Sequence, residues 1–306
     1  MKESIFFLLS FFICYIFGLI ETIIGLGNGL HPDSAYYIEN SNEIVFEILA
    51  NDNLFSVFNN GYYFIVAFLG SSSAMLILLN QIAFAVTNVM MSKCYSRFGI
   101  FEAILCFAPY RLHLANHVLK DTMIIFSVVF FLTAAPRGFK FIGISLGILL
   151  RLISPVYYLS HFKFSRIVGL TSAFLLSLML VPELAEFFND RNDVDMAGRE
   201  YDLVPNFSNF EFGYYLRFIV WPIIGLSGLT IFLVQTVSIL PLAFELIFFG
   251  WKCRNRLVSF YLISGIIAMF VTTYTSFLRY IYPLVFVFYL KLYYENRNHR
   301  NSRTPR

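Results

Sequence analysis

Long apolar runs, separated by short polar segments, are the feature that most constrains this chain. In the first run, residues 5–26, Glu21 is the only charged residue. A helix needs about 20 apolar residues to cross the hydrocarbon core of a bilayer, and further apolar runs recur as far as residue 294. Charged residues make up 13% of the chain, against about 25% in soluble domains, and the mean hydropathy is +0.70. The sequence therefore predicts an all-α bundle of transmembrane helices.

The distribution of charge predicts how this bundle is oriented. Lys and Arg collect at the cytoplasmic ends of membrane helices, and the basic tail 295–306 follows the last apolar run. The segments 27–60 and 183–216 are acidic instead. We therefore predict a single integral-membrane domain, residues 1–294, in the inner membrane. It has about eight crossings, both termini in the cytoplasm, and outer loops at 27–60 and 183–216.

Segment 141–160 has two interpretations. As a full span, it would place Lys163 and Arg166 outside and the acidic loop 183–216 inside. Alternatively, Arg151 and Pro155 break the segment into two half-helices that enter and leave on the cytoplasmic side. Broken helices are tolerated at membrane depth where they line a cavity. The rule that positive charge stays inside favours the re-entrant interpretation.

The ionisable residues that interrupt or cap the apolar runs are the candidate functional residues. A charge within a membrane is energetically unfavourable, so each such residue indicates a function or a buried partner. Arg is suited to phosphate because its forked donors form paired hydrogen bonds. The predicted topology gathers most of these residues at the outer face, where they would form a cup for an anionic, lipid-linked substrate. They are Asp33, Arg111, His113, His117, Lys120, Asp121, Arg217 and Arg279, with Arg151 deeper in the membrane.

Each candidate also has a structural interpretation. Asp33 could cap a helix, and the cations at the membrane surface could be interfacial anchors. Arg151 needs an anionic partner, either a substrate phosphate or a buried acid of the bundle such as Glu21 or Glu245.

Two histidines raise the question of a metal. His113 and His117 lie four residues apart, on one face of a helix. A pair without a third ligand is a weak metal signal, so neither a metal nor another cofactor is predicted. No phosphate-binding loop, dinucleotide fingerprint, hydrolase elbow or haem motif occurs, and no nucleic-acid partner is expected.

Four segments together suggest a family. His31-Pro32-Asp33-Ser34-Ala35-Tyr36-Tyr37 resembles the first outer loop of GT-C-type membrane glycosyltransferases, where an essential carboxylate is often followed by Tyr. Asn60-Gly61-Tyr62-Tyr63 resembles the opening of their second helix. The junction from Pro109-Tyr110-Arg111 to Lys120-Asp121-Thr122 is similar to their next outer junction. Arg279-Tyr280-Ile281-Tyr282-Pro283 resembles a motif near the end of these enzymes and of O-antigen and exopolysaccharide polymerases.

This resemblance implies an enzyme of bacterial surface-polysaccharide assembly that uses a polyprenyl-(pyro)phosphate-linked sugar as donor. Asp33 would be the catalytic carboxylate. Arg111, Lys120, Arg151, Arg217 and Arg279 would bind phosphate, and His113, His117, Asp121 and Tyr280 would contact the acceptor or glycan. The short chain and its one sizeable loop favour a polymerase. A single-sugar transferase and a lipid-linked oligosaccharide flippase or other transporter remain alternatives. The expected partners are the polyprenyl-linked glycan, membrane lipids and other polysaccharide-assembly proteins.

Overall fold

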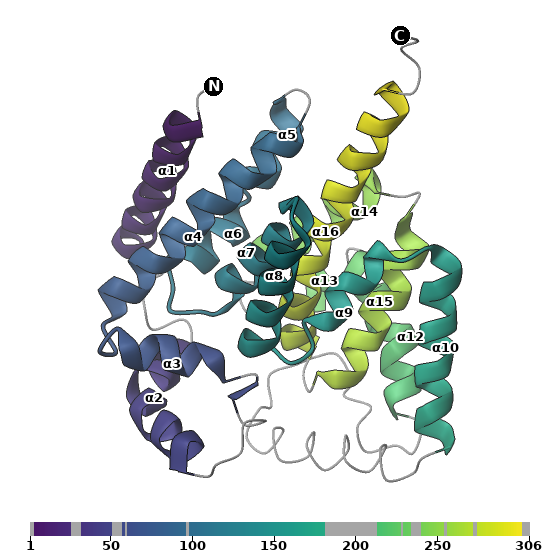
Figure 1. The fold of residues 1–306 in the computed structure, drawn as a ribbon, viewed down its shortest axis with the longest axis horizontal. Coiled ribbons are helices and arrows are strands. Elements are labelled where there is room, and N and C mark those ends of the chain that lie inside the picture. Colours follow the sequence, from purple (N-terminus) through teal and green to yellow (C-terminus); the bar gives the residue numbers. More distant parts are fainter. Residues whose placement is uncertain are drawn as a thin grey trace. The chain divides into compact units, whose positions relative to one another are not determined.

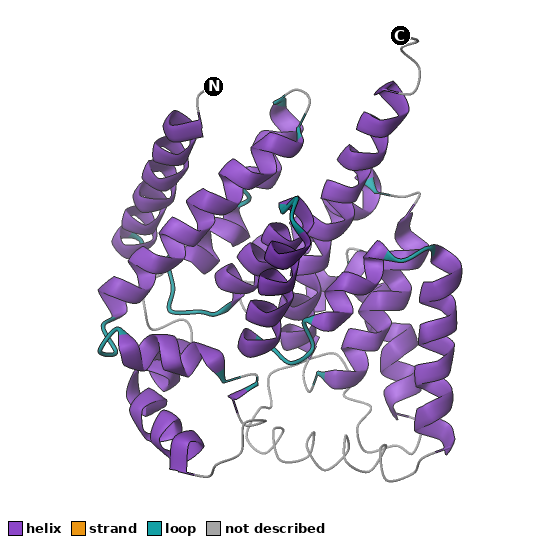
Figure 2. Ribbon diagram, in the orientation of Figure 1, coloured by secondary structure: helices purple, strands orange, loops and turns teal. Residues whose placement is uncertain are grey.

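In the part of the chain that it describes, the computed structural model is built of helices (Figures 1 and 2). It describes residues 3–25, 32–50, 57–58, 60–95, 98–180, 213–227, 229–233, 240–253, 256–271 and 274–301. No strand occurs within these ranges, which confirms the all-α prediction for this part of the chain. The loop predicted at 183–216 lies almost wholly outside the described residues.

The helices fall into two compact units. Unit 1 comprises residues up to Pro155 and those from Leu290 onward, and unit 2 comprises Val156–Tyr289. Unit 1 contains α1 (Glu3–Ile23), α2 (Pro32–Ala50), α3 (Gly61–Phe68), α4 (Ser73–Cys94), α5 (Ile100–Cys106), α6 (Pro109–Ala115), α7 (Asp121–Thr133) and α8 (Arg137–Leu150).

Unit 1 is a bundle in which α4 is the central helix, packed against α1, α6 and α7. Helix α8 packs on α7 and α3, and α2 packs on α3. At one end of the bundle, Lys93 at the end of α4 pairs with Glu3 at the start of α1, with 2.9 Å between Nζ and Oε2. Helices α1 and α4 are therefore antiparallel. We call the opposite end, where α1 and α8 finish and α7 begins, the polar end of unit 1.

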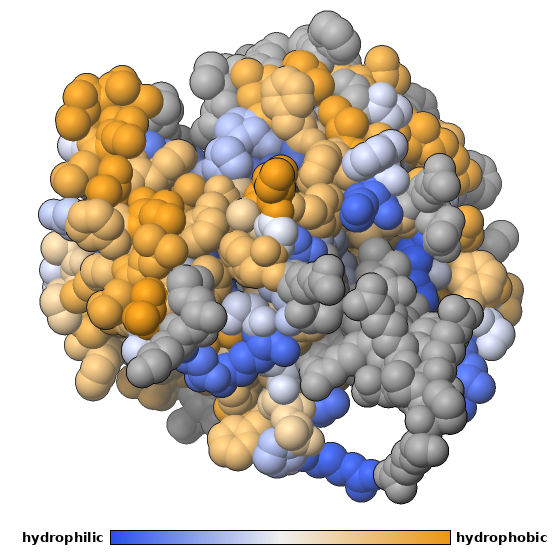
Figure 3. All heavy atoms as spheres, turned by 90° about the horizontal axis from the view of Figure 1, so that it is seen from above, coloured by the Kyte–Doolittle hydropathy of each residue, from blue (hydrophilic) through white to orange (hydrophobic). Residues whose placement is uncertain are grey.

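Two described helices, α1 and α4, are long and apolar enough to cross a membrane. Helix α1 is also poorly covered by the protein, and large apolar side chains such as Leu8, Phe12 and Ile23 are exposed on it. Figure 3 shows many apolar side chains over the part of unit 1 where α1 and α4 lie. Such a surface is suited to lipid rather than water. Helices α7, α10, α12 and α15 are apolar but shorter.

The region predicted as an outer loop at 27–60 contains α2. Its charged residues Glu39, Glu43 and Glu47 recur every four residues and are exposed. Residues at helical spacing on the opposite face, among them Ser34 and Tyr37, are buried. This periodicity of 3.6 residues was present in the sequence and predicts an amphipathic helix. Pro32 at the first position and Asp33 in the first turn both favour a helix start.

Segment 141–160 is broken where the sequence predicted. Helix α8 ends at Leu150, and the backbone of Arg151 is extended, with φ −156° and ψ 115°. The residue before a proline avoids helical geometry, and a new short helix, α9 (Pro155–Tyr158), begins at Pro155. A 3₁₀ turn, η3 (Leu159–His161), follows. The broken form of the segment is thus observed, while its re-entrant course through a membrane stays a prediction.

Unit 2 is held together by the packing of α12 on α15, with α10 against α15 and α14 against α12. Phe218, Ile266 and Met269 form a buried apolar cluster between these helices. Besides η3 and all of α9 after Pro155, this unit contains α10 (Phe164–Leu180), α12 (Gly213–Leu226), α13 (Thr230–Leu233), α14 (Leu240–Lys252), α15 (Leu257–Phe270) and the first part of α16 (Tyr274–Asn301).

Candidate functional site

Three of the four segments that carry the family resemblance meet at the polar end of unit 1. Ser34 on α2 donates a hydrogen bond to the carbonyl of Val118, between α6 and α7, at 3.3 Å. The Asn80 amide of α4 holds the same junction, since it donates to the carbonyls of His117 (2.8 Å) and Leu119 (3.1 Å). Helix α3 joins them through its contacts with α2 and α8.

Tyrosine rings fix α2 on α3 beside Asp33. Tyr37 makes edge contacts with Tyr62 and Tyr63, with ring centroids 4.9 and 5.1 Å apart, and Tyr36 contacts Tyr63 at 6.4 Å. Tyr63 lies close enough to Asp33 for the two side chains to interact electrostatically. The phenol of Tyr63 can donate a hydrogen bond.

Asp121 and Arg151 form a buried ion pair at this end. Arg151 Nη2 lies 2.8 Å from Asp121 Oδ1, and each side chain is 2% exposed. Asp121 begins α7 and Arg151 ends α8, so the pair joins two antiparallel helices at adjacent ends. The prediction that Arg151 has an anionic partner is confirmed. Its partner is Asp121 rather than Glu21 or Glu245, which were the acids named from sequence.

Exposure separates the predicted site residues of unit 1. Asp33 and Lys120 are half-buried, so part of each side chain can reach a ligand. The side chains of Asp121 and Arg151 are buried, as are those of His113, His117 and Arg111. Asp33 is thus the carboxylate, and Lys120 the cation, best placed to contact a substrate at the polar end.

Arg111 lies away from the predicted substrate cup. Its guanidinium donates hydrogen bonds to the Asn88 side-chain oxygen and to the carbonyls of Cys106 and Phe84. It also stacks over the Phe84 ring at 4.5 Å. These partners lie on α4 and at the end of α5, so Arg111 joins helices within unit 1. The geometry favours a structural role for this residue.

Glu21 lies beside His113 and His117 in the structure, although it is far from them in the sequence. Glu21 Oε1 lies 2.5 Å from His113 Nδ1, and Glu21 Oε2 lies 3.8 Å from His117 Nε2. The imidazole rings are 4.3 Å apart, and all three side chains are buried. We call Glu21, His113 and His117 the His–Glu cluster. Sequence reasoning named each residue but not their meeting, because α1 and α6 are far apart along the chain.

Amide side chains of α4 also escaped the sequence analysis. Asn80, Gln81 and Asn88 are buried on one side of this apolar helix. Gln81 donates to Asn116 Oδ1 at 2.7 Å, and Asn88 accepts from Arg111. Their burial could have been predicted from the sequence, because three amides occur in a helix that is otherwise apolar. Polar groups in membrane helices usually face the interior of the bundle.

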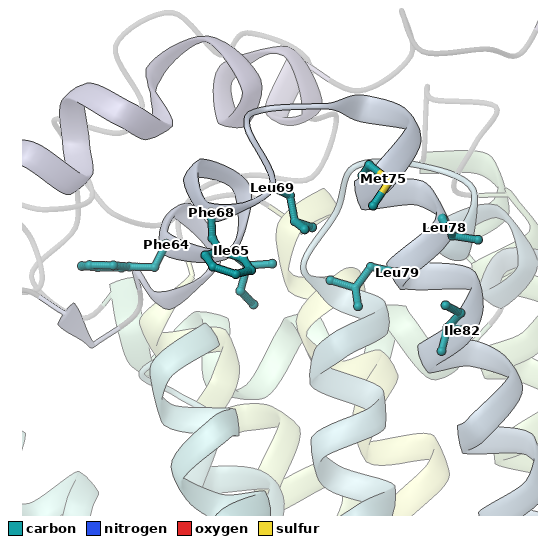
Figure 4. Close-up of a pocket in the computed structure, with 8 residues that line it drawn as sticks. All are labelled: Phe64, Ile65, Phe68, Leu69, Met75, Leu78, Leu79 and Ile82. Atoms are coloured by element: carbon teal, nitrogen blue, oxygen red, sulfur yellow. The ribbon is translucent and has the colours of Figure 1, made fainter.

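An open apolar groove of about 630 Å³ lies between α3 and α4 (Figure 4). Only apolar side chains line it. From α3 and the following turn come Phe64, Ile65, Phe68 and Leu69, and from α4 come Met75, Leu78, Leu79 and Ile82. The groove begins one residue after Tyr63, so one short helix contributes both to the polar end and to the groove.

The remaining predicted site residues lie in unit 2. Arg217 is fully buried, donates to the Val271 carbonyl at 2.7 Å and lies 5.5 Å from the Trp221 ring, which indicates a structural role. Arg279 and Tyr280 are half-buried on α16, and the Tyr280 carbonyl accepts a hydrogen bond from Tyr157 at 2.8 Å.

Comparisons with models of known protein families, with curated proteins and with solved structures found no match. The fold itself therefore defines the class. The described part of the chain is all-helical and contains two helices that are long and apolar enough to cross a membrane. Among the described residues of unit 1, Asp33, Lys120 and the Asp121–Arg151 pair lie at one end of the bundle.

Proposed function

We propose that this chain is a membrane glycosyltransferase of bacterial surface-polysaccharide assembly. In this proposal it joins repeat units carried on polyprenyl pyrophosphate at the outer face of the inner membrane. The observation that carries the proposal is the placement of α3. Its first turn contributes Tyr62 and Tyr63 to a polar site with a carboxylate and cations, and its later residues line the apolar groove. A ligand with a charged head and an apolar tail fits this arrangement.

The chemistry assigns a role to each accessible group. Asp33 accepts the proton of the acceptor hydroxyl, and the oxygen of that hydroxyl attacks the anomeric carbon of the donor sugar. A carbon–oxygen bond forms to the acceptor while the bond from the anomeric carbon to the pyrophosphate oxygen breaks. Polyprenyl pyrophosphate leaves with the electron pair, and Lys120 stabilises its negative charge. The Tyr63 phenol donates a hydrogen bond to a sugar oxygen.

The groove is proposed to hold part of the polyprenyl chain. Its volume of about 630 Å³ lies within the range of about 300–1,000 Å³ typical of small-molecule sites. A long isoprenoid therefore occupies it with only part of its length, and the rest lies in the lipid. Phe68 and Met75, at the exposed edge of the groove, would face that lipid.

We also propose the membrane arrangement predicted from sequence, a multi-pass protein of about eight crossings with cytoplasmic termini and a re-entrant segment at Arg151. Its support within unit 1 is the separation of charge between the two ends of the bundle. Lys93 and Arg137 mark one end, and the acidic face of α2 adjoins the other. The positive-inside rule then places the polar end outside, where polymerisation would occur.

The proposal is tested in a strain that lacks this gene. Loss of the high-molecular-weight ladder of surface glycan is expected, with single repeat units remaining on the carrier lipid. Wild type should restore the ladder, and Asp33→Asn should not. The abundance of Asp33→Asn in the membrane is expected to be near normal, because a charge in the first turn of a helix contributes only about 0.3–1 kcal/mol. Glu39→Gln, an exposed substitution on the same helix, is the matched control and should restore the ladder. A full ladder from Asp33→Asn would remove Asp33 from the mechanism.

A further inference from the structure

The His–Glu cluster has the composition and geometry of a transition-metal site. We propose that Glu21, His113 and His117 bind one divalent transition-metal ion, for which Zn²⁺ is the probe of choice. One ligand atom from each side chain can be chosen so that all three lie within 4.8 Å of one another. Around a tetrahedral Zn²⁺ with bonds of about 2.1 Å, ligand atoms lie about 3.4 Å apart, so a small inward movement of the side chains completes the site.

The choice of ligands favours a transition metal over Mg²⁺ or Ca²⁺. Two imidazoles and one carboxylate suit Zn²⁺ and its first-row neighbours, whereas the alkaline-earth ions prefer oxygen ligands alone. Three protein ligands also leave a fourth position for water, as in open zinc sites.

Glu21 supplies a second argument. Its Oε1 contacts His113, while its Oε2 is buried and has no hydrogen bond from any group that the structure describes. A buried carboxylate oxygen is unfavourable unless it is paired, and a bound cation would pair it. Glu21 Oε2 lies 3.8 Å from His117 Nε2, which is too far for a direct hydrogen bond. A metal ion between the two atoms could bind both of them.

The surroundings hold the cluster in place. Asn116, between the two histidines, donates to the Cys14 carbonyl of α1 at 3.0 Å and accepts from Gln81 of α4. Helix α1 can approach this closely because residue 18 is glycine. A Cβ there would lie 2.3 Å from Asn116 Oδ1. The His117 carbonyl is held by Asn80. Supporting contacts of this kind orient metal ligands, and their loss typically lowers metal affinity about 10–100-fold.

The ion would link α1 to the α6 segment at the base of the polar end. This inference does not depend on the proposed transferase activity, because it concerns binding alone. The readouts are metal content and thermal stability of the purified full-length protein in detergent.

The experiment compares wild type, Glu21→Gln, His117→Gln and the control Glu3→Gln, a same-type change at the other end of α1. Each protein is stripped with chelator and titrated with Zn²⁺, and bound metal is measured by mass spectrometry after gel filtration. Wild type and Glu3→Gln are expected to bind one Zn²⁺ per chain and to melt at a higher temperature with it. Glu21→Gln and His117→Gln should bind it more than tenfold more weakly and show no such rise.

Co²⁺ gives an independent signature, because its visible absorption reports low-coordinate ligation by nitrogen and oxygen. These bands are expected in wild type and not in Glu21→Gln. A wild-type protein that binds no Zn²⁺ would overturn the proposal whether or not the variants fold. Equal Zn²⁺ binding by wild type and by both folded cluster variants would overturn it as well.

Discussion

At the scale of single residues, the buried pair of Asp121 and Arg151 has the largest expected energetic effect. Asp121→Asn removes the carboxylate but keeps the shape of the side chain, so a buried guanidinium loses its charged partner. Breaking a buried ion pair in this way costs about 3–5 kcal/mol of stability. We expect a lower melting temperature in detergent and lower membrane abundance for this variant.

Removal of both charges separates the charge effect from simple loss of packing. The double variant Asp121→Asn with Arg151→Met leaves no buried charge at this position, and it is expected to be more stable than Asp121→Asn alone. Asp33→Asn, at a half-buried carboxylate, is the control and should melt near the wild-type temperature. A double variant no more stable than the single one would contradict the account of this pair.

The need of Arg151 for a partner could be predicted from the sequence, because a charge within an apolar segment is unfavourable by itself. The identity of the partner could not, because Asp121 reaches Arg151 only through the packing of α7 on α8. The same holds for Glu21 and the two histidines, which come together because α1 packs on α6.

At the scale of helices, the contact of α3 with α8 depends on Gly61. A Cβ at this position would lie 2.8 Å from the backbone oxygen of Leu149, closer than real Cβ contacts. Gly61→Ala is therefore expected to displace α3 and to lower stability by about 1–3 kcal/mol, a typical cost of overpacking. Because α3 contributes Tyr62 and Tyr63 to the polar end, the variant should also make less polymer.

The matched control is Gly138→Ala on α8, the helix that α3 contacts. No atom lies within 4 Å of a Cβ built at Gly138, and Ala is the better helix former by up to about 1 kcal/mol. Thermal unfolding should show Gly138→Ala at or above wild type and Gly61→Ala clearly below it. Equal melting temperatures for the two variants would show that the α3–α8 contact is not tight.

Most helices could be predicted from the apolar runs of the sequence. Where each helix ends or breaks depends on particular residues such as proline. The break before Pro155 was predictable from proline geometry. Helix α2 was not predicted, because the acidic composition of 27–60 was interpreted as that of an outer loop and the helical periodicity of its apolar residues was not used. The apolar stretch that follows residue 60 is divided between α3 and α4, and this division decides where the apolar groove begins.

At the scale of the whole molecule, the orientation in the membrane is tested with two engineered cysteines. Glu39 on α2 and Arg137 at the start of α8 are both exposed, and the four native cysteines are buried. In spheroplasts, a membrane-impermeant maleimide should label Glu39→Cys directly, and label Arg137→Cys only after the membrane is permeabilised. The reverse pattern, or labelling of both before permeabilisation, would be inconsistent with the predicted orientation.

The function is tested most directly by reconstitution. Purified protein in liposomes is given a repeat unit linked to polyprenyl pyrophosphate, and the products are resolved by mass. The account predicts that wild type lengthens the lipid-linked glycan by whole repeats and releases polyprenyl pyrophosphate, while Asp33→Asn does neither. A single-sugar transferase would instead add one residue from a polyprenyl-phosphate sugar, and a flippase would move the lipid without changing its mass. Unchanged lipid-linked repeat units with folded wild-type protein would contradict the proposed polymerase.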